Sequence, residues 1–129
     1  MGARANNIIR IPSSVSGDFF KHWLVVLKPY HKMTDKEIDI VACFLRKRYE
    51  LGEKISDPEL LDKFLMSEET KKEVREECGM PLSYFQVLMS RLKKRGVLMD
   101  GRINPKFIPR LKRGDDNFKL LFLFDFSGK

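Results

Sequence analysis

Residues 73–103 read EVREECGMPLSYFQVLMSRLKKRGVLMDGRI and hold the pattern that decides the predicted fold. A charged helical segment ends at Gly79, and Met80-Pro81 makes the turn. A second helix is predicted from about Leu82 to Arg95, because apolar residues recur there at helical spacing. Asp100-Gly101, between apolar residues, is typical of a two-residue β-hairpin turn. Helix, turn, helix and hairpin in this order predict a winged helix-turn-helix core.

Capping residues and breakers predict further helices before this turn. The first helix is predicted over residues 18–27, with N-cap candidates Ser13, Ser14 and Ser16 and an end at Lys28-Pro29. The second begins at the capping box Thr34-Asp35-Lys36-Glu37 and ends at Gly52. A third begins at Asp57-Pro58, and a fourth, over residues 68–78, begins after the N-cap Ser67. The helix after Thr34 has a single apolar stripe of helical period, made of Ile38, Val41, Ala42, Leu45 and Tyr49.

Length and composition are those of one globular, mainly α domain. The chain has 129 residues, of which 43% are hydrophobic and 33% charged, with a formal net charge of +7. We expect an N-terminal arm over 1–16, a winged helix-turn-helix-like domain over 17–111, and a linker and C-terminal strand over 112–129. No apolar run approaches the roughly 20 residues of a membrane helix, so no membrane partner is expected. Cys43 and Cys78 lack a CxxC partner, which favours reduced structural thiols in a cytosolic setting.

Both ends of the chain contain apolar residues that favour association. Near the N-terminus these are Ile8, Ile9 and Ile11. Near the C-terminus the even-numbered positions are all apolar, which predicts a β-strand made of Phe118, Leu120, Phe122, Phe124 and Phe126. An unpaired strand of this kind invites pairing with another chain. The alternative is that it folds back beside the hairpin.

Charge is distributed unevenly along the chain. Residues 50–77 contain ten acidic and five basic residues, whereas residues 90–113 contain nine basic residues and one acidic residue. The acidic side would oppose DNA phosphates, so the two patches favour head-to-tail self-association. The candidate interface residues in these patches are Glu73, Glu76, Glu77, Arg91, Lys94 and Arg95.

DNA binding is the alternative function. A helix-turn-helix domain reads bases through the first half of its second helix. The candidates for such contacts are Ser83, Tyr84, Gln86, Ser90 and Arg91 on that helix and Arg102 on the hairpin. The first half of that helix contains neither Arg nor Lys, and cations at its end also complement the helix dipole.

No sequence feature favours catalysis, a cofactor, a bound metal or a small-molecule substrate. The chain has no Gly-rich phosphate loop, no GxSxG and no CxxC pair. His22 is expected to be a packed helix residue and His31 a turn residue, without a catalytic partner. We therefore expect a protein that is not an enzyme.

Several segments together resemble a family of small proteins from crAss-like bacteriophages of gut Bacteroides. The resemblance covers residues 20–126, and the segments that carry it are 27–37, 75–79, 88–97, 101–109 and 118–122. It implies a virion structural protein, such as a ring or connector of the head–tail assembly in the neck or tail, assembled in the host cytoplasm. The implied partners are copies of the chain and other virion proteins, and no functional residue is carried over with the resemblance.

Overall fold

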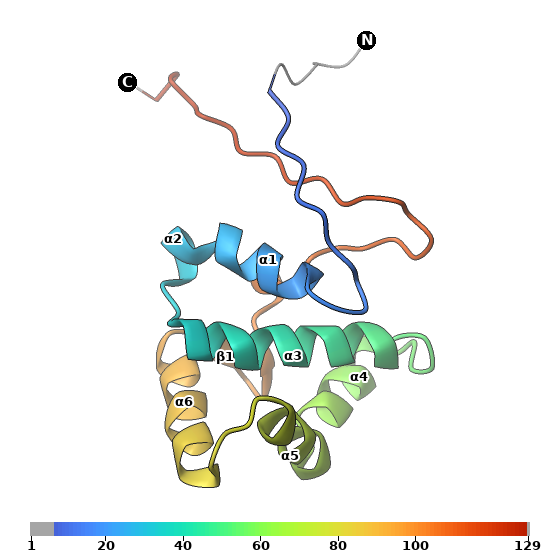
Figure 1. Cartoon of the computed structure of the whole chain (residues 1–129), viewed down its shortest axis with the longest axis vertical. Coiled ribbons are helices and arrows are strands. Elements are labelled where there is room, and N and C mark those ends of the chain that lie inside the picture. Colours follow the sequence, from blue (N-terminus) through green and yellow to red (C-terminus); the bar gives the residue numbers. More distant parts are fainter. Residues whose placement is uncertain (1–6, 129) are drawn as a thin grey trace.

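The computed structural model describes residues 7–128 and shows a small helical body from which both ends of the chain extend (Figure 1). Within these residues it contains helices, one antiparallel pair of short strands and a 3₁₀ turn. The elements are α1 (Phe19–Val26), α2 (Lys28–His31), α3 (Asp35–Leu51), α4 (Pro58–Leu65), α5 (Glu68–Glu77), α6 (Leu82–Lys94), β1 (Leu98–Met99), β2 (Arg102–Ile103) and η1 (Pro105–Phe107). The mainly helical fold with a short hairpin is thus confirmed, whereas the winged helix-turn-helix architecture stays a prediction.

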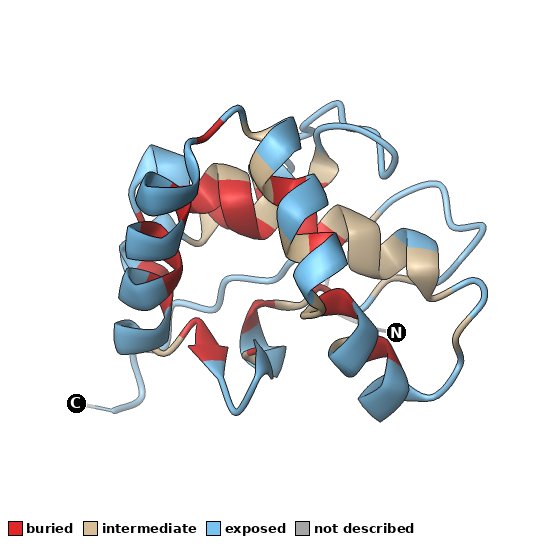
Figure 2. Ribbon diagram, turned by 90° about the horizontal axis from the view of Figure 1, so that it is seen from below, coloured by how far each residue is buried: buried red, intermediate tan, exposed pale blue. Residues whose placement is uncertain are grey.

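Helix α3 lies at the centre of the body, with α1 on one side and α4, α5 and α6 on the other (Figure 1). Its N-terminus is the predicted capping box: the Thr34 hydroxyl accepts from the Glu37 amide at 3.3 Å, and the Glu37 carboxylate accepts from the Thr34 amide at 2.7 Å. Ile40 and Phe44 lie outside the predicted stripe and are fully buried as well. Figure 2 shows that buried positions gather on the sides of the helices that face one another. Because helices pack on both sides of it, α3 is buried around most of its circumference.

The predicted starts of α4 and α5 are confirmed. The Asp57 carboxylate accepts from the Glu59 amide at 3.1 Å, with Pro58 as the first helical residue. The Ser67 hydroxyl accepts from the Thr70 amide at 3.3 Å. These caps satisfy amide groups that have no partner within their own helices, so local sequence is sufficient to place both N-termini.

The turn and hairpin around α6 also follow the sequence. Gly79 and Gly96 end their helices with φ of +65° and +77°, in the left-handed region that favours glycine. Asp100-Gly101 makes the tight turn with φ of +53° and +72°, as a type I′ hairpin requires. Leu98 pairs with Ile103, and both side chains are buried against the body.

The region before α3 differs from the prediction in two ways. The N-cap of α1 is Asp18 rather than a serine, and its carboxylate accepts from the Ser14 amide at 2.9 Å. Helix α1 ends before Lys28-Pro29, as predicted, but these two residues then form the first turn of a short helix, α2, that was not predicted. Proline is tolerated there because the first amide groups of a helix lack intrahelical acceptors anyway. Trp23 connects α1 to the η1 turn, which is distant in sequence, because its indole N–H donates to the Phe107 carbonyl at 2.8 Å.

The predicted C-terminal strand is wrong: residues 118–126 run as an irregular extended segment with no strand partner (Figure 1). Phe118 packs edge-on against Phe19 and Trp23, with ring centroids 5.6 and 5.4 Å apart, and the chain then leaves the body. A strand needs hydrogen bonds from a neighbour, and the two-residue strands of the hairpin offer none in its path. The N-terminal arm is likewise irregular over residues 7–14, and its residues 1–6 lie outside the described part of the chain.

Candidate protein interfaces

The two extended arms carry the most exposed apolar side chains of the described chain. Figure 1 shows both arms leaving the body on the side of α1 and α2. In the N-terminal arm, Ile9 is 88% exposed. In the C-terminal arm, Phe124 and Phe126 are 80% and 88% exposed. Contact of so much apolar surface with water is unfavourable, which makes the two arms a candidate binding surface.

The C-terminal arm has two unlike faces near the body. Leu120 and Phe122 are roughly half as exposed as Leu121 and Leu123. Even-numbered side chains therefore lean toward the body at first, as their alternation predicts, but the odd-numbered leucines on the other face are apolar too. Beyond residue 122 neither face is covered. The arm is an apolar ribbon with unpaired backbone groups, which is the form that strand addition to another chain uses.

The outer face of α6 is a second candidate surface. Its inner residues, Phe85, Leu88, Met89 and Leu92, are buried in the core. The residues predicted to contact DNA all lie on the exposed side of this helix or on the hairpin: Ser83, Tyr84, Gln86, Ser90, Arg91 and Arg102. Leu82 and Val87 add exposed apolar side chains to the same face. The predicted residues of α6 thus share the exposed side of that helix, and Arg102 is exposed on β2.

The basic cluster at the end of α6 divides into free and occupied residues. Within residues 7–128, Arg91, Lys93 and Lys94 are exposed and form no ion pair. Arg95 differs, because its guanidinium Nε lies 3.4 Å from the carboxylate of Glu37, which is fully buried at the start of α3. That pair connects α6 to the capping box, so Arg95 has an internal role besides the predicted interfacial one.

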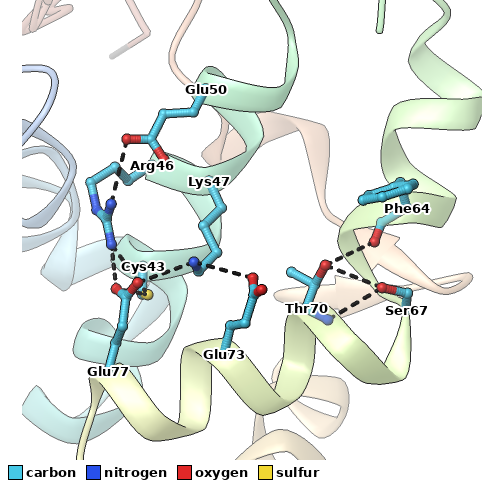
Figure 3. A network of polar contacts seen from close by, with 9 residues as sticks. All are labelled: Cys43, Arg46, Lys47, Glu50, Phe64, Ser67, Thr70, Glu73 and Glu77. Atoms are coloured by element: carbon cyan, nitrogen blue, oxygen red, sulfur yellow. Dashed lines mark hydrogen bonds and ion pairs between the residues drawn. The ribbon is translucent and has the colours of Figure 1, made fainter. Parts of the chain in front are cut away.

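Two of the three predicted interfacial carboxylates point inward, to α3 (Figure 3). The Lys47 ammonium lies 3.5 Å from the Glu73 carboxylate and 3.1 Å from that of Glu77. Arg46 also forms an ion pair with Glu77. Glu76 is exposed and pairs with no cation of the described chain. Cations of α3 thus neutralise the charges of Glu73 and Glu77. Of the three predicted carboxylates, Glu76 is the one available for an ion pair with another molecule.

Hydrogen bonds and charges around Glu77 favour its ionised form. Burial opposes ionisation, but hydrogen bonds from Cys43 and Lys47 and the charges of Arg46 and Lys47 lower the pKa of Glu77 below its usual value. The Cys43 thiol donates to Glu77 Oε2 at 3.1 Å. This network holds the end of α5 against the middle of α3. Sequence reasoning missed it, because Cys43 on α3 and Glu77 on α5 are 34 residues apart and no local pattern connects them.

The two histidines have structural positions that the sequence did not reveal. His31, predicted as a turn residue, is buried at the end of α2, with Nε2 2.6 Å from the Leu24 carbonyl and Nδ1 accepting from the Met33 amide at 2.9 Å. His22 is half-buried and bonds the Ser13 hydroxyl at 2.6 Å, which fastens the base of the N-terminal arm. Asp18 lies 3.9 Å from the other His22 nitrogen, beyond hydrogen-bond distance.

Among the described residues, no cluster of three or more His, Cys, Asp and Glu side chains has the arrangement of a metal site. No helix in this part of the chain is both long and apolar enough to cross a bilayer. Comparisons with protein-family models, with curated proteins and with solved structures found no match.

Proposed function

We propose that this protein is an assembly component that binds copies of its own chain through its two apolar arms. The observation that carries the proposal is the exposure of Ile8, Ile9, Leu121, Leu123, Phe124 and Phe126 on segments that leave the folded body. In the assembly, the arm after Phe118 adds as a strand to an extended segment of a neighbouring copy. The alternating pattern that finds no partner within one chain then finds one between chains.

A second copy is the partner that this surface fits best. The arms leave the same side of the body, so an N-terminal and a C-terminal segment are presented together to a neighbour (Figure 1). The exposed cations of α6 and the free carboxylate of Glu76 add complementary charge for a head-to-tail arrangement. A head-to-tail contact closes into a ring when its rotation permits. The resemblance to phage proteins would place such a ring in the neck or tail of a virion.

The molar mass of the full chain, measured by light scattering over a concentration series, tests this proposal. We expect oligomers for the unaltered chain and a shift to monomer for the double variant Phe124→Asp and Phe126→Asp, which places charge on the arm without touching the core. Leu60→Asp on α4 is the matched control, because Leu60 is exposed but lies on the body. A chain that stays monomeric at every concentration, or a double variant that associates like the unaltered chain, would contradict arm-mediated assembly.

The free cations of α6 favour DNA binding as the second candidate function. In that interpretation α5 and α6 form a helix-turn-helix, the hairpin β1–β2 is its wing, and Arg91 and Arg102 contact the duplex. The internal pairing of Glu73 and Glu77 removes part of the repulsion that the acidic segment would exert on phosphates. Binding of a labelled duplex across a salt series tests it: affinity should fall steeply with salt, and Arg91→Ala should reduce the slope by about one. Absence of duplex binding at low salt would exclude this function.

A further inference from the structure

Cys43 and Cys78 are distant in sequence but line the same open groove, which has a volume of about 720 Å³. Cys43 lies on α3, one turn after Asp39, and Cys78 follows the last residue of α5. The Cys78 sulfur is 3.7 Å from the Asp39 carbonyl oxygen, and the Cys43 sulfur is 3.1 Å from the carboxylate of Glu77, the residue next to Cys78. Helical side chains tilt toward the N-terminus, so Cys43 extends toward the turn that Cys78 contacts.

The two thiols differ in accessibility and in acidity. Cys43 is buried, whereas Cys78 is partly exposed to the groove. Interaction with the Cys43 thiol lowers the pKa of Cys78, although burial opposes this change. The pKa of Cys43 is strongly raised, by the interaction with Cys78, by burial and by the Glu77 carboxylate. An accessible thiol that ionises easily beside a buried one that does not is the arrangement of an attacking and a resolving cysteine.

We propose that Cys43 and Cys78 form a redox-active dithiol that reduces small-molecule disulfides and becomes an intramolecular disulfide. The Cys78 thiolate attacks one sulfur of the small disulfide, forms a mixed disulfide and releases one small thiolate. The hydrogen bond to Glu77 orients the Cys43 thiol, which then loses its proton to solvent in the groove and attacks the Cys78 sulfur. The second small thiolate leaves, and the proton passes to it or stays in water. The protein loses two electrons and two protons, and the small disulfide gains them.

The groove gives this reaction access from solvent. It is bounded by α3, by the end of α5 and by residues 14–21, which connect the N-terminal arm to α1. Lys21 and Arg46 lie on its wall, each paired with a carboxylate, Asp39 and Glu77 respectively. A small disulfide reaches Cys78 first, because Cys43 lies deeper. The disulfide formed would join α3 to the end of α5 across the Glu77 network.

The reaction of the reduced, folded full chain with 5,5′-dithiobis(2-nitrobenzoate), an aromatic disulfide, tests the proposal. We expect two equivalents of released thionitrobenzoate and a product lighter than the reduced chain by two hydrogen atoms in intact-mass spectra. Cys43→Ser should release one equivalent and retain the adduct on Cys78. Cys78→Ser should react at least about tenfold more slowly, because the remaining thiol is buried and poorly ionised. Circular dichroism of each variant confirms that its helices are intact.

Three results would overturn the proposal. A chain that retains two adducts and no intramolecular disulfide would show that the thiols act independently. A Cys78→Ser variant that reacts as fast as the unaltered chain would show that Cys43 is the entry point. A reaction that needs denaturant would show that the groove does not admit a disulfide. If a variant loses its helices, the product mass of the unaltered chain still decides whether the two thiols join.

Discussion

Helix α3 and the C-terminal arm are both rich in apolar residues, yet within residues 7–128 the helix is largely buried and the arm largely exposed. Phe44 is 0% exposed on α3, whereas Phe124 is 80% exposed on the arm. The difference arises from what surrounds each segment. Helix α3 satisfies its own backbone hydrogen bonds and packs against four other helices, but an extended arm needs a neighbouring strand. Stability of the single chain should therefore depend on α3, and association on the arms.

The largest expected difference between these regions is in core packing. Phe44→Ala should lower the free energy of unfolding by about 3–5 kcal/mol, because the side chain is fully buried and its removal leaves a cavity. Phe124→Ala should change it by less than about 0.5 kcal/mol. Urea denaturation at a concentration where the chain is monomeric measures both. Equal losses in the two variants would mean that the arm packs on the body in solution.

The link between α3 and α6 should give the next largest effect. Glu37→Ala removes the reciprocal half of the capping box and the partner of Arg95, so we expect a loss of about 1–3 kcal/mol in the free energy of unfolding. Glu37→Gln keeps the bond to the Thr34 amide but not the charge, and should lose less. If the two variants are equally destabilised, the ion pair rather than the cap dominates.

Acid should weaken the body through His31. Burial lowers the pKa of His31 below 6.5; the Leu24 carbonyl opposes this change, and the charges of Lys28 and Arg95 add to it. The unfolded chain then binds the proton more readily, so the free energy of unfolding should fall as the pH drops below about 6.5. Unfolding of the unaltered chain at pH values on both sides of this point measures the effect. His31→Gln should remove this part of the pH dependence, while His22→Gln, on the surface of α1, should leave it unchanged.

The smallest effect on stability is expected from removing the C-terminal arm beyond Phe118. Deletion of residues 119–129 should change the thermal midpoint of the monomer little, because the described residues beyond 119 contribute no buried side chain. Calorimetry on dilute samples checks this. A large fall in the midpoint would instead show that the arm stabilises the body, and the contrast between the two regions would fail.

The sequence predicted the local geometry of the body well and its long-range contacts poorly. The capping box at Thr34, the proline start at Pro58 and the Asp100-Gly101 turn each depend on a few neighbouring residues, and each is confirmed. The strand at 118–126 was wrong because alternation indicates which faces are apolar, not whether a partner strand is present. The candidate surface residues of α6 could be found from helical spacing, since its buried side is periodic.

Sequence by itself determined where the helices from α3 to α6 start, where the hairpin turns, and that the two ends are apolar. These features depend on backbone groups and side chains within a few residues of one another, so they are readable along the chain. Tertiary structure alone decided that Glu77 is neutralised by α3, that Arg95 reaches Glu37, and that Cys43 and Cys78 share a groove. Those contacts exist because separate helices pack at one angle and depth, which no local pattern encodes.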